Sequence, residues 1–521
     1  MKKKIIYIIL IVIVLLRFLL SYRLKSFFIV NLTYDDKLMI YKLMDLNKGL
    51  YLGNYTPLTL IKGIIYPLCL FISYHLHLTY SSFFTILYIL SCSYFAYSLK
   101  SIIKNKYIII GIYIILLFNP ISYSSELFQR LYRNSLAPTE LLFYLGLLIR
   151  IISDKKNYVH RYILLGIMIF IMIMTKEENI WIILSMLVLF IYKIYQSHDP
   201  IHISMYLLPV FVTILCLNIL SFINARHYGI YTYNELSKSE FKNTYIKILQ
   251  IKDKEKIKRV SIPKSTLLKL AKESEVFNFS EKEIDVFSRG SSDYKGETSN
   301  ATMMWSFRLF IHMKQKFKNG YEANEYYRKL GKDIDRLFKE GKLKKEFAFP
   351  SIFLNVPTKG DLKELPSTVI KMIAYTSSYQ DVKVLVDKDI LKDQLYNKVV
   401  KAYNIEFIDR HNSANIQKVN PIGYEIIRII YKWFTIIFSI ISIGIFIINI
   451  KKKDLLNLIL LIILLSYFII IGGVSYTHVT AFNSIRYCYL GNVFILQSLF
   501  ILFNIVRVID NKKGNIIRNE E

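Results

Sequence analysis

The 521-residue chain has few cysteines, and none shows the spacing of a disulfide framework or a metal site. All four, Cys69, Cys92, Cys216 and Cys488, fall in or beside apolar segments. The sequence also lacks a P-loop, a GxGxxG fingerprint after a strand, a GxSxG elbow and an HExxH motif. These absences argue against ATP-driven transport, the commoner hydrolases and a structural zinc centre.

Acidic residues are scarce as well, since 39 Asp and Glu stand against 68 Lys and Arg, giving a formal net charge of +29. In a soluble protein this excess would indicate nucleic-acid binding. Here the basic residues gather in short loops between apolar blocks, around 100–106, 155–161, 451–453 and 507–513. Positive charge of this kind marks the cytoplasmic side of membrane proteins. We therefore expect membrane lipids, and no nucleic acid, as partners.

Hydrophobic residues make up 53% of the chain and come in long blocks. Because a helix of about 20 apolar residues crosses a bilayer, we predict a polytopic α-helical membrane protein with about ten spanning helices. The positive-inside rule places both termini in the cytoplasm and makes the spans alternate without conflict. The predicted spans are 5–22, 81–99, 107–123, 138–152, 162–175, 179–195, 203–223, 426–448, 455–471 and 487–508.

The first block follows Lys2, Lys3 and Lys4, as in a signal peptide, but no small-x-small cleavage site follows it. We interpret it as a retained anchor. Arg17 lies inside this block, so its side chain must reach the interface or face protein.

The spans divide the chain into four parts. Residues 1–223 form a seven-span module whose first outer loop is 23–80, and within this loop 60–78 is expected to lie on the outer face as a juxtamembrane or re-entrant helix. Residues 224–422 form an inserted extracytoplasmic domain, α/β or mainly α, with helices at 302–317 and 321–341 and strands at 382–386 and 405–409. Residues 423–509 hold three more spans, and 510–521 form a cytoplasmic tail.

An acidic pair, Asp35 and Asp36, follows the first span in the first outer loop. Asp36 stands three residues after Thr33, so a capping box at a helix that ends near Gly49 would explain it without catalysis. A cap leaves Asp35 unexplained at the membrane interface, where its neighbours could tune its pKa. Catalysis and capping both stay open at this point.

A second acidic pair, Glu177 and Glu178, occupies a very short turn between two apolar blocks. Carboxylates so close to hydrocarbon must be solvated, paired or used. Lys176 offers a simple ion pair; the functional alternative is a second acid that positions a hydroxyl or a metal ion beside Asp35. Asp35, Asp36, Glu177 and Glu178 are hard oxygen ligands, so a divalent metal is compatible with them, although no cofactor is required.

Several basic residues lie on the outer side against the charge rule. Arg130 and Arg133 are three apart, so a helix would place them on one face, and Arg486 precedes the last span. The planar guanidinium of arginine can bind two phosphate oxygens at once, so these residues are candidates for binding a lipid phosphate. Lys62 is a weaker candidate for the same role. The alternative is that these residues anchor the protein to lipid headgroups. His227 and His478 are further outer-face candidates, with a structural role for His227 as the simpler reading.

Together these features resemble the C-type glycosyltransferase superfamily, membrane enzymes that use polyprenyl-phosphate-linked sugars. The resemblance is carried by Tyr34-Asp35-Asp36 in the first outer loop, Thr56-Pro57-Leu58 with Pro67, the seven spans before a large outer domain, and Arg486. One proline of the family's usual pair is replaced by Thr56. The insertion, with Asn224–Gly229 and Trp305–Arg308, also resembles an uncharacterised bacterial subgroup.

The resemblance implies an inverting transferase in which Asp35 or Asp36 is the catalytic base and the arginines hold the lipid phosphate. The expected partners are a polyprenyl-phosphate-linked sugar donor and a cell-envelope glycan, lipid or protein acceptor. Two alternatives stay open: a transporter or flippase for lipid-linked sugars, and a non-catalytic protein that binds or assembles an envelope polymer.

Overall fold

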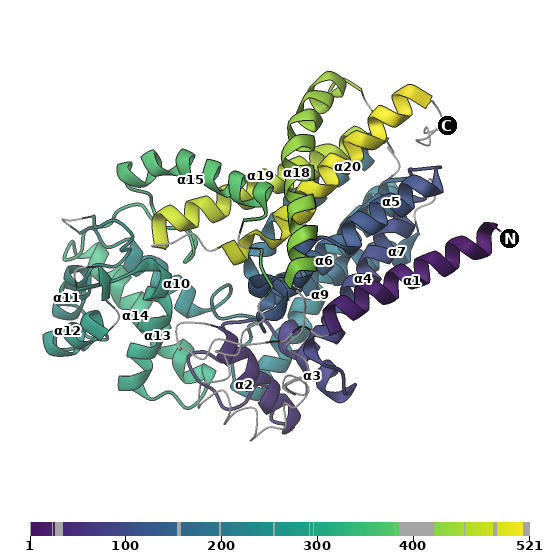
Figure 1. Cartoon of the computed structure of the whole chain (residues 1–521). Coiled ribbons are helices and arrows are strands. Elements are labelled where there is room, and N and C mark those ends of the chain that lie inside the picture. Colours follow the sequence, from purple (N-terminus) through teal and green to yellow (C-terminus); the bar gives the residue numbers. More distant parts are fainter. Residues whose placement is uncertain are drawn as a thin grey trace.

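A computed structural model of the chain shows an almost entirely helical protein (Figure 1). It describes residues 2–22, 24, 26, 35–153, 158–196, 200–253, 256–290, 292–294, 296–380, 382–384, 421–452, 454–482 and 487–513. The N-terminal end of α1 and the C-terminal end of α20 lie at one end of a long helical bundle, and the helices α10–α14 lie at the other end (Figure 1).

The bundle and its outer loop are built from α1 (Lys2–Tyr22), α2 (Asp36–Asn47), α3 (Ile65–His75), α4 (Tyr80–Leu99), α5 (Lys106–Leu117), η1 (Pro120–Tyr123), η2 (Ser125–Gln129), η3 (Arg133–Ser135), α6 (Ala137–Ser153), α7 (Val159–Thr175), η4 (Glu177–Trp181), α8 (Ile182–Gln196) and α9 (Pro200–Tyr228). The remainder comprises α10 (Glu240–Leu249), α11 (Lys264–Glu273), α12 (Glu281–Gly290), β1 (Ser292–Tyr294), β2 (Glu297–Thr298), α13 (Asn300–Gln315), α14 (Gly320–Lys339), α15 (Lys359–Ser378), α18 (Pro421–Asn449), α19 (Leu455–Ala481), η7 (Tyr487–Leu490) and α20 (Gly491–Lys513).

Eight helical segments of the described chain are long and apolar enough to cross a membrane. Two of the ten predicted spans correspond to apolar helices that are shorter than these eight segments. The helix predicted at 107–123 stops at Leu117, because Asn119 caps a new 3₁₀ turn at Pro120, whose ring cannot continue the preceding helix. The helix predicted at 162–175 is α7, with 17 residues, or roughly 25 Å at the usual helical rise. α3 has only 11 residues, so the 60–78 stretch does not contain a spanning helix.

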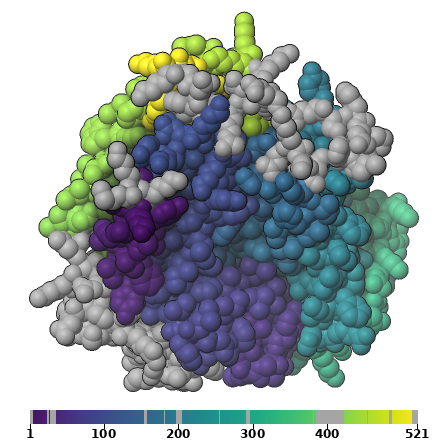
Figure 2. Space-filling view, turned by 90° about the vertical axis from the view of Figure 1, so that its right-hand side faces the viewer, coloured from purple at the N-terminus to yellow at the C-terminus, as the bar shows by residue number. Residues whose placement is uncertain are grey.

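The outside of the bundle is apolar, as a lipid-facing surface must be. α1 lies on this outside (purple in Figure 2), and side chains such as Ile8 and Leu19 are more than half exposed. α18 behaves in the same way, since Ile440 and Ile448 are 72% and 82% exposed. Apolar surface of this extent is not stable against water, so these helices support membrane insertion.

Arg17 of α1 faces protein, which is one of the two positions expected for it. Its guanidinium is fully buried and donates to the carbonyl oxygens of Leu117 at 2.8 Å and Ser122 at 3.0 Å. The Leu117 carbonyl is available because α5 ends at this residue, and the last carbonyls of a helix have no partner within it.

The inserted domain is mainly α, and its core is formed by α10 to α14. The predicted helices at 302–317 and 321–341 are confirmed as α13 and α14; Asn319 caps α14, and Gly341 follows its end with a φ of +72°. β1 and β2 pair as a short antiparallel hairpin. The strand predicted at 382–386 is not seen at the described residues 382–384, and the strand predicted at 405–409 lies outside the described residues.

α15 belongs with the bundle rather than with the core of the inserted domain. A capping box between Thr358 and Asp361 starts it. Its residues Met372 and Tyr375, and the C-cap residue Tyr379, pack in the same apolar core as α4, α6, α19 and α20. α15 therefore runs beside α19 (Figure 1). It ties the inserted domain to the C-terminal spans.

Candidate functional site

Four of the predicted residues form one compact cluster of charges, Asp35, Lys62, Arg133 and Glu177, which we call the outer-loop cluster. Arg133 bridges the two carboxylates: its Nη2 lies 3.1 Å from Asp35 Oδ2 and its Nη1 lies 2.9 Å from Glu177 Oε2. Lys62 Nζ lies 3.4 Å from the same Asp35 oxygen and 3.9 Å from Glu177. Residues separated by up to 142 positions in sequence thus share one site.

Asp35 reaches this cluster because it stands at the N-terminal end of α2. It occupies the N-cap position, but its side chain makes no capping hydrogen bond. The carboxylate therefore points to Arg133 and Lys62 instead of to the helix. Its side chain is 22% exposed, while that of Arg133 is 1% exposed. Asp35 is the acid that connects the buried cations with the surface.

The neighbouring Asp36 is engaged elsewhere. Both of its oxygens accept from Arg130, with Nε–Oδ2 and Nη2–Oδ1 distances of 2.7 Å, and its side chain is completely buried. Thr33, the partner of Asp36 in the alternative capping box, lies outside the described residues. α2 begins at Asp36, with Asp35 at the N-cap position, and the Asp36 carboxylate binds Arg130. Burial would lower the pKa of Arg130, but the hydrogen bonds with Asp36 outweigh it and raise that pKa.

Arg130 and Arg133 do not share a helical face, contrary to the prediction. Arg130 ends the one-turn π-helix η2, and Tyr132 has an extended backbone with φ −139° and ψ 146°. This break separates the two side chains, so that Arg130 binds Asp36 and Arg133 binds Asp35. The Tyr132 ring remains close to both guanidiniums, at 4.6 Å and 5.8 Å.

Only one of the two predicted glutamates takes part. The turn predicted between the apolar blocks is confirmed as η4, and Glu177 at its start faces Arg133. Glu178 is exposed. The ion pair expected from Lys176 is replaced by a cation–π contact, since its Nζ lies 4.6 Å from the centre of the Tyr489 ring.

The inserted domain contributes two residues that sequence reasoning did not assign to the site. The ring of Trp305, on α13, lies 4.7 Å from Lys62 Nζ. Asn234, in the loop after α9, donates from Nδ2 to Glu177 Oε1 and to the Ile61 carbonyl, both at 3.2 Å. The Trp305–Arg308 motif of the insertion was the available signal for Trp305.

A buried ion pair fixes the inserted domain on the first outer loop. Arg308 Nη2 lies 2.7 Å from Glu235 Oε2, and both side chains are at most 2% exposed. The Tyr55 hydroxyl donates to Glu235 at 2.9 Å, and Arg308 Nε donates to the Pro57 carbonyl at 2.9 Å. Lys62 is only a few residues further along this loop, so the pair also holds the cluster in place.

Lys42 lies beneath the cluster and was likewise missed. Its side chain is buried, and its Nζ donates to the Lys62 carbonyl at 2.9 Å. Burial first, and then the charge of Arg133, lower the pKa of Lys42 to about 7. The signal in the sequence is its position on α2 among Met39, Leu43 and Met44, on the face that turns inward.

The electrostatics of the cluster keep Asp35 ionised. Burial alone would raise the pKa of Asp35, but the positive charges of Lys62 and Arg133 outweigh burial and lower it. Both cations contact Oδ2, and no described residue binds Oδ1. Arg133 Nε is buried and has no acceptor among the described residues. The site thus holds a partly exposed carboxylate and an arginine with donor capacity to spare.

The remaining predicted residues lie away from the outer-loop cluster or outside the described residues. His227 is exposed near the end of α9, where its ring stacks on Tyr51 at 4.6 Å, in keeping with a structural role. His478 is buried near the C-terminal end of α19. Arg486 lies outside the described residues. Within the described part of the chain, no three His, Cys, Asp or Glu side chains gather as metal ligands, so the four acids do not form one carboxylate site.

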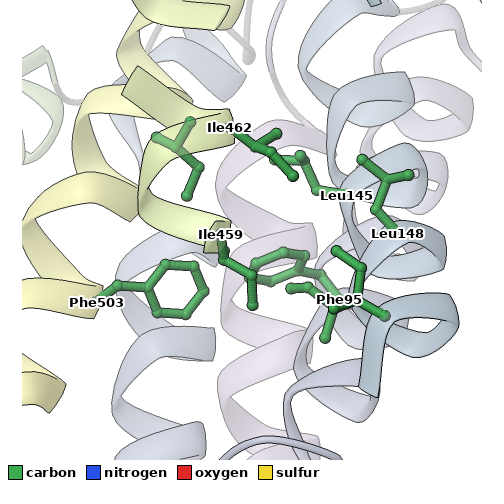
Figure 3. A pocket seen from close by; sticks show the side chains of 9 residues that line it. Phe95, Leu145, Leu148, Ile459, Ile462 and Phe503 are labelled. Atoms are coloured by element: carbon green, nitrogen blue, oxygen red, sulfur yellow. The ribbon is translucent and has the colours of Figure 1, made fainter. Parts of the chain in front are cut away.

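The bundle itself contains a cavity of another kind. It lies between α4, α6, α19 and α20 and is lined by nine apolar side chains, among them Phe95, Leu145, Leu148, Ile459, Ile462 and Phe503 (Figure 3). This lining offers no hydrogen-bond partner to a charged headgroup. The cavity therefore gives no support to a polar transport path through this part of the bundle.

No protein family, curated protein or solved structure matches the chain. What the structure itself establishes is a helical protein whose long apolar helices mark it as a membrane protein, with a cluster of opposite charges between the bundle and the inserted domain.

Proposed function

We propose that the chain is an inverting glycosyltransferase that moves a sugar from a polyprenyl-phosphate donor to a cell-envelope acceptor at the outer face of the membrane. The observation that carries the proposal is the contact of the first-loop carboxylate Asp35 with two cations, Arg133 and Lys62, at 3.1 Å and 3.4 Å. General-base chemistry beside a departing phosphate needs these two kinds of group together.

The geometry favours Asp35 over Asp36 as the base. A general base must be reachable by the hydroxyl that it deprotonates. Asp35 is partly exposed and has one oxygen that no described residue binds, whereas both oxygens of the fully buried Asp36 accept from Arg130. In the proposed enzyme, Asp36 and Arg130 are positioning residues that hold the start of α2.

Arg133 and Lys62 would receive the donor phosphate. In the present arrangement their two positive charges are balanced by Asp35 and Glu177. An entering phosphate would compete with Asp35 for these cations and would also find the buried Nε of Arg133. As the cations turn to the phosphate, the pKa of Asp35 rises toward its ordinary value, which makes it a better base.

The reaction follows from these roles. The acceptor hydroxyl attacks the anomeric carbon and gives its proton to Asp35, while the bond between that carbon and the phosphate oxygen breaks. The electron pair leaves with polyprenyl phosphate, whose charge Arg133 and Lys62 stabilise. Glu177, held by Asn234 at 3.2 Å, keeps Arg133 in position and adds negative charge near the oxocarbenium-like transition state.

This proposal fixes an orientation in the membrane. The outer-loop cluster and the inserted domain face the extracytoplasmic side, and both termini face the cytoplasm. The N-terminal end of α1 and the C-terminal end of α20 lie at the end of the bundle opposite to α10–α14, which supports that assignment (Figure 1).

A transfer assay tests the proposal. Membranes containing the protein are supplied with radiolabelled polyprenyl-phosphate hexoses and an envelope extract, and label transfer is followed. Asp35→Asn should lower the rate by about 10²–10⁴-fold, the usual contribution of a general base. Asp45→Asn, a change on the same helix outside the cluster, should leave the rate unchanged. Equal rates for wild type and Asp35→Asn would refute the role of Asp35.

A further inference from the structure

A second polar site lies where the inserted domain meets α15 and the end of α19, and we call it the junction groove. It is open to solvent and is lined by residues of the inserted domain, α15 and α19. Its lining includes Arg259, Asn300, Phe347, Asp361 and Thr480. Asn300 begins α13, Asp361 lies in the first turn of α15, and Thr480 is next to the last residue of α19. Three separate elements therefore build this groove.

Two acceptor atoms in this lining have no donor. Asn300 Oδ1 and Asp361 Oδ1 are buried and accept no hydrogen bond from any described residue. Their partner atoms are firmly held: Asn300 Nδ2 donates to the Thr480 carbonyl at 2.6 Å, and Asp361 Oδ2 accepts from the Thr358 amide and hydroxyl, each at 2.8 Å. Asp361 as a whole is only 2% exposed.

These atoms favour a ligand that brings hydrogen-bond donors. A buried acceptor without a donor costs about 1–3 kcal/mol, so a donor that reaches it gains that amount. Because the two acceptors come from different helices, one ligand that satisfies both must carry donors at more than one position.

The same groove offers an apolar surface. Phe347 is 67% exposed, and Leu354 and Val356, which also line the groove, are 43% and 38% exposed. An exposed aromatic ring beside fixed polar groups is suited to a ligand with one apolar face and hydroxyls at its rim.

The charges of the groove do not favour an anionic ligand. Lys256 pairs with Glu346 at 3.5 Å, and Arg259 pairs with Glu364 at 3.4 Å. The basic groups near the groove are thus already matched by acids, in contrast to a phosphate site, where donors are left for the anion.

We propose that the junction groove binds a neutral glycan chain. Sugar hydroxyls donate to Asn300 Oδ1 and Asp361 Oδ1, and the apolar face of one pyranose ring packs on Phe347. Since α19 ends beside the groove, the glycan is held at the membrane surface. This binding is independent of the glycosyl transfer proposed above, and it gives the chain a separate hold on an envelope polymer.

The full-length protein in lipid nanodiscs, titrated with cellotetraose, maltotetraose and chitotetraose, tests this site by calorimetry and saturation-transfer NMR. At least one tetrasaccharide should bind. Asp361→Asn keeps one oxygen that accepts from Thr358, but it places an amide NH₂ donor where the free carboxylate oxygen faced the groove. Phe347→Ala removes the aromatic ring on which the sugar packs. Asp361→Asn should weaken binding by about tenfold or more, the equivalent of one lost hydrogen bond to a charged group. Phe347→Ala should also weaken binding, because the apolar contact of the ring with the sugar is lost.

Two variants serve as controls. Phe353→Ala removes a neighbouring exposed aromatic ring that does not line the groove, and Asp35→Asn changes the outer-loop cluster; both should bind the glycan as the wild type does. Unaltered melting temperatures would show that the groove variants fold. The proposal fails if no tetrasaccharide binds at millimolar concentration, or if folded Asp361→Asn and Phe347→Ala bind as tightly as the wild type. Loss of glycosyl transfer in Asp35→Asn leaves this outcome untouched.

Discussion

The Asp36–Arg130 pair makes a quantitative prediction about stability. Two hydrogen bonds of 2.7 Å join side chains that are 0% and 6% exposed. Asp36→Asn removes the negative charge that faces the buried guanidinium of Arg130. Glu126, 3.5 Å from Arg130 Nη1 and 56% exposed, is a weaker ionic contact than the one lost. Breaking a buried ion pair in this way costs about 3–5 kcal/mol. We expect the low end of that range, because the exposed side chain of Glu126 can move closer to Arg130 and replace part of the lost ionic interaction.

The second half of the prediction concerns the double variant. Replacing both charges, in Asp36→Asn with Arg130→Gln, removes the buried cation together with its carboxylate, so most of the lost stability should return. A double-mutant cycle should therefore give a coupling energy of about 2–3 kcal/mol.

Unfolding in detergent micelles, followed by tryptophan fluorescence and size-exclusion profiles, measures both values. The reasoning is refuted if Asp36→Asn is as stable as the wild type, or if the double variant is less stable than the single one.

Three further predictions concern the neighbourhood of the site. Gly63→Ala should abolish folding or lower the stability by about 1–3 kcal/mol or more, the range for overpacking, because a Cβ there would lie 1.7 Å from the Met174 carbonyl oxygen. In Gly111→Ala, the control, the added Cβ has no atom within 4 Å, so this variant should be stable. Equal expression of the two variants would contradict the geometry. Glu235→Gln should leave the buried Arg308 without its carboxylate partner and lower the free energy of unfolding by about 3–5 kcal/mol, measured as faster proteolysis of the inserted domain. Unchanged proteolysis would contradict a stabilising role for the Arg308–Glu235 pair. Between pH about 7 and 10 the folded protein releases the proton of Lys42 and the unfolded chain keeps it, so stability should rise with pH; Lys42→Met should flatten this rise in thermal melts, and an unchanged slope would refute the assignment.

Part of the architecture could be predicted from sequence because bilayer crossing and amphipathic packing leave local patterns. Long apolar blocks predicted the spanning segments, and the helical period between two glycines predicted α14. The early end of α5 was missed because apolar residues continue past Leu117, although Asn119-Pro120 carries the stop signal.

The meeting of Asp35 with Arg133 was predicted by sidedness alone, since both stood on the outer face, and a contact of 3.1 Å agrees with it. The assignment of each arginine to one aspartate was beyond the sequence, because it depends on the extended residue Tyr132 between them. Trp305 and Asn234 were missed for another reason. They are brought to Lys62 and Glu177 by the docking of the inserted domain, which leaves no local periodicity.

The most direct test of the central claim separates donor binding from the chemical step in Asp35→Asn. Affinity for polyprenyl phosphate is measured by surface plasmon resonance on nanodiscs, and sugar transfer is measured in a single turnover with saturating donor. If Asp35 is the base and competes with phosphate for Arg133 and Lys62, the variant should bind polyprenyl phosphate at least as tightly as the wild type while transfer falls by about 10² or more. Transfer that persists at the wild-type rate, or that falls only in proportion to lost donor binding, would contradict the account.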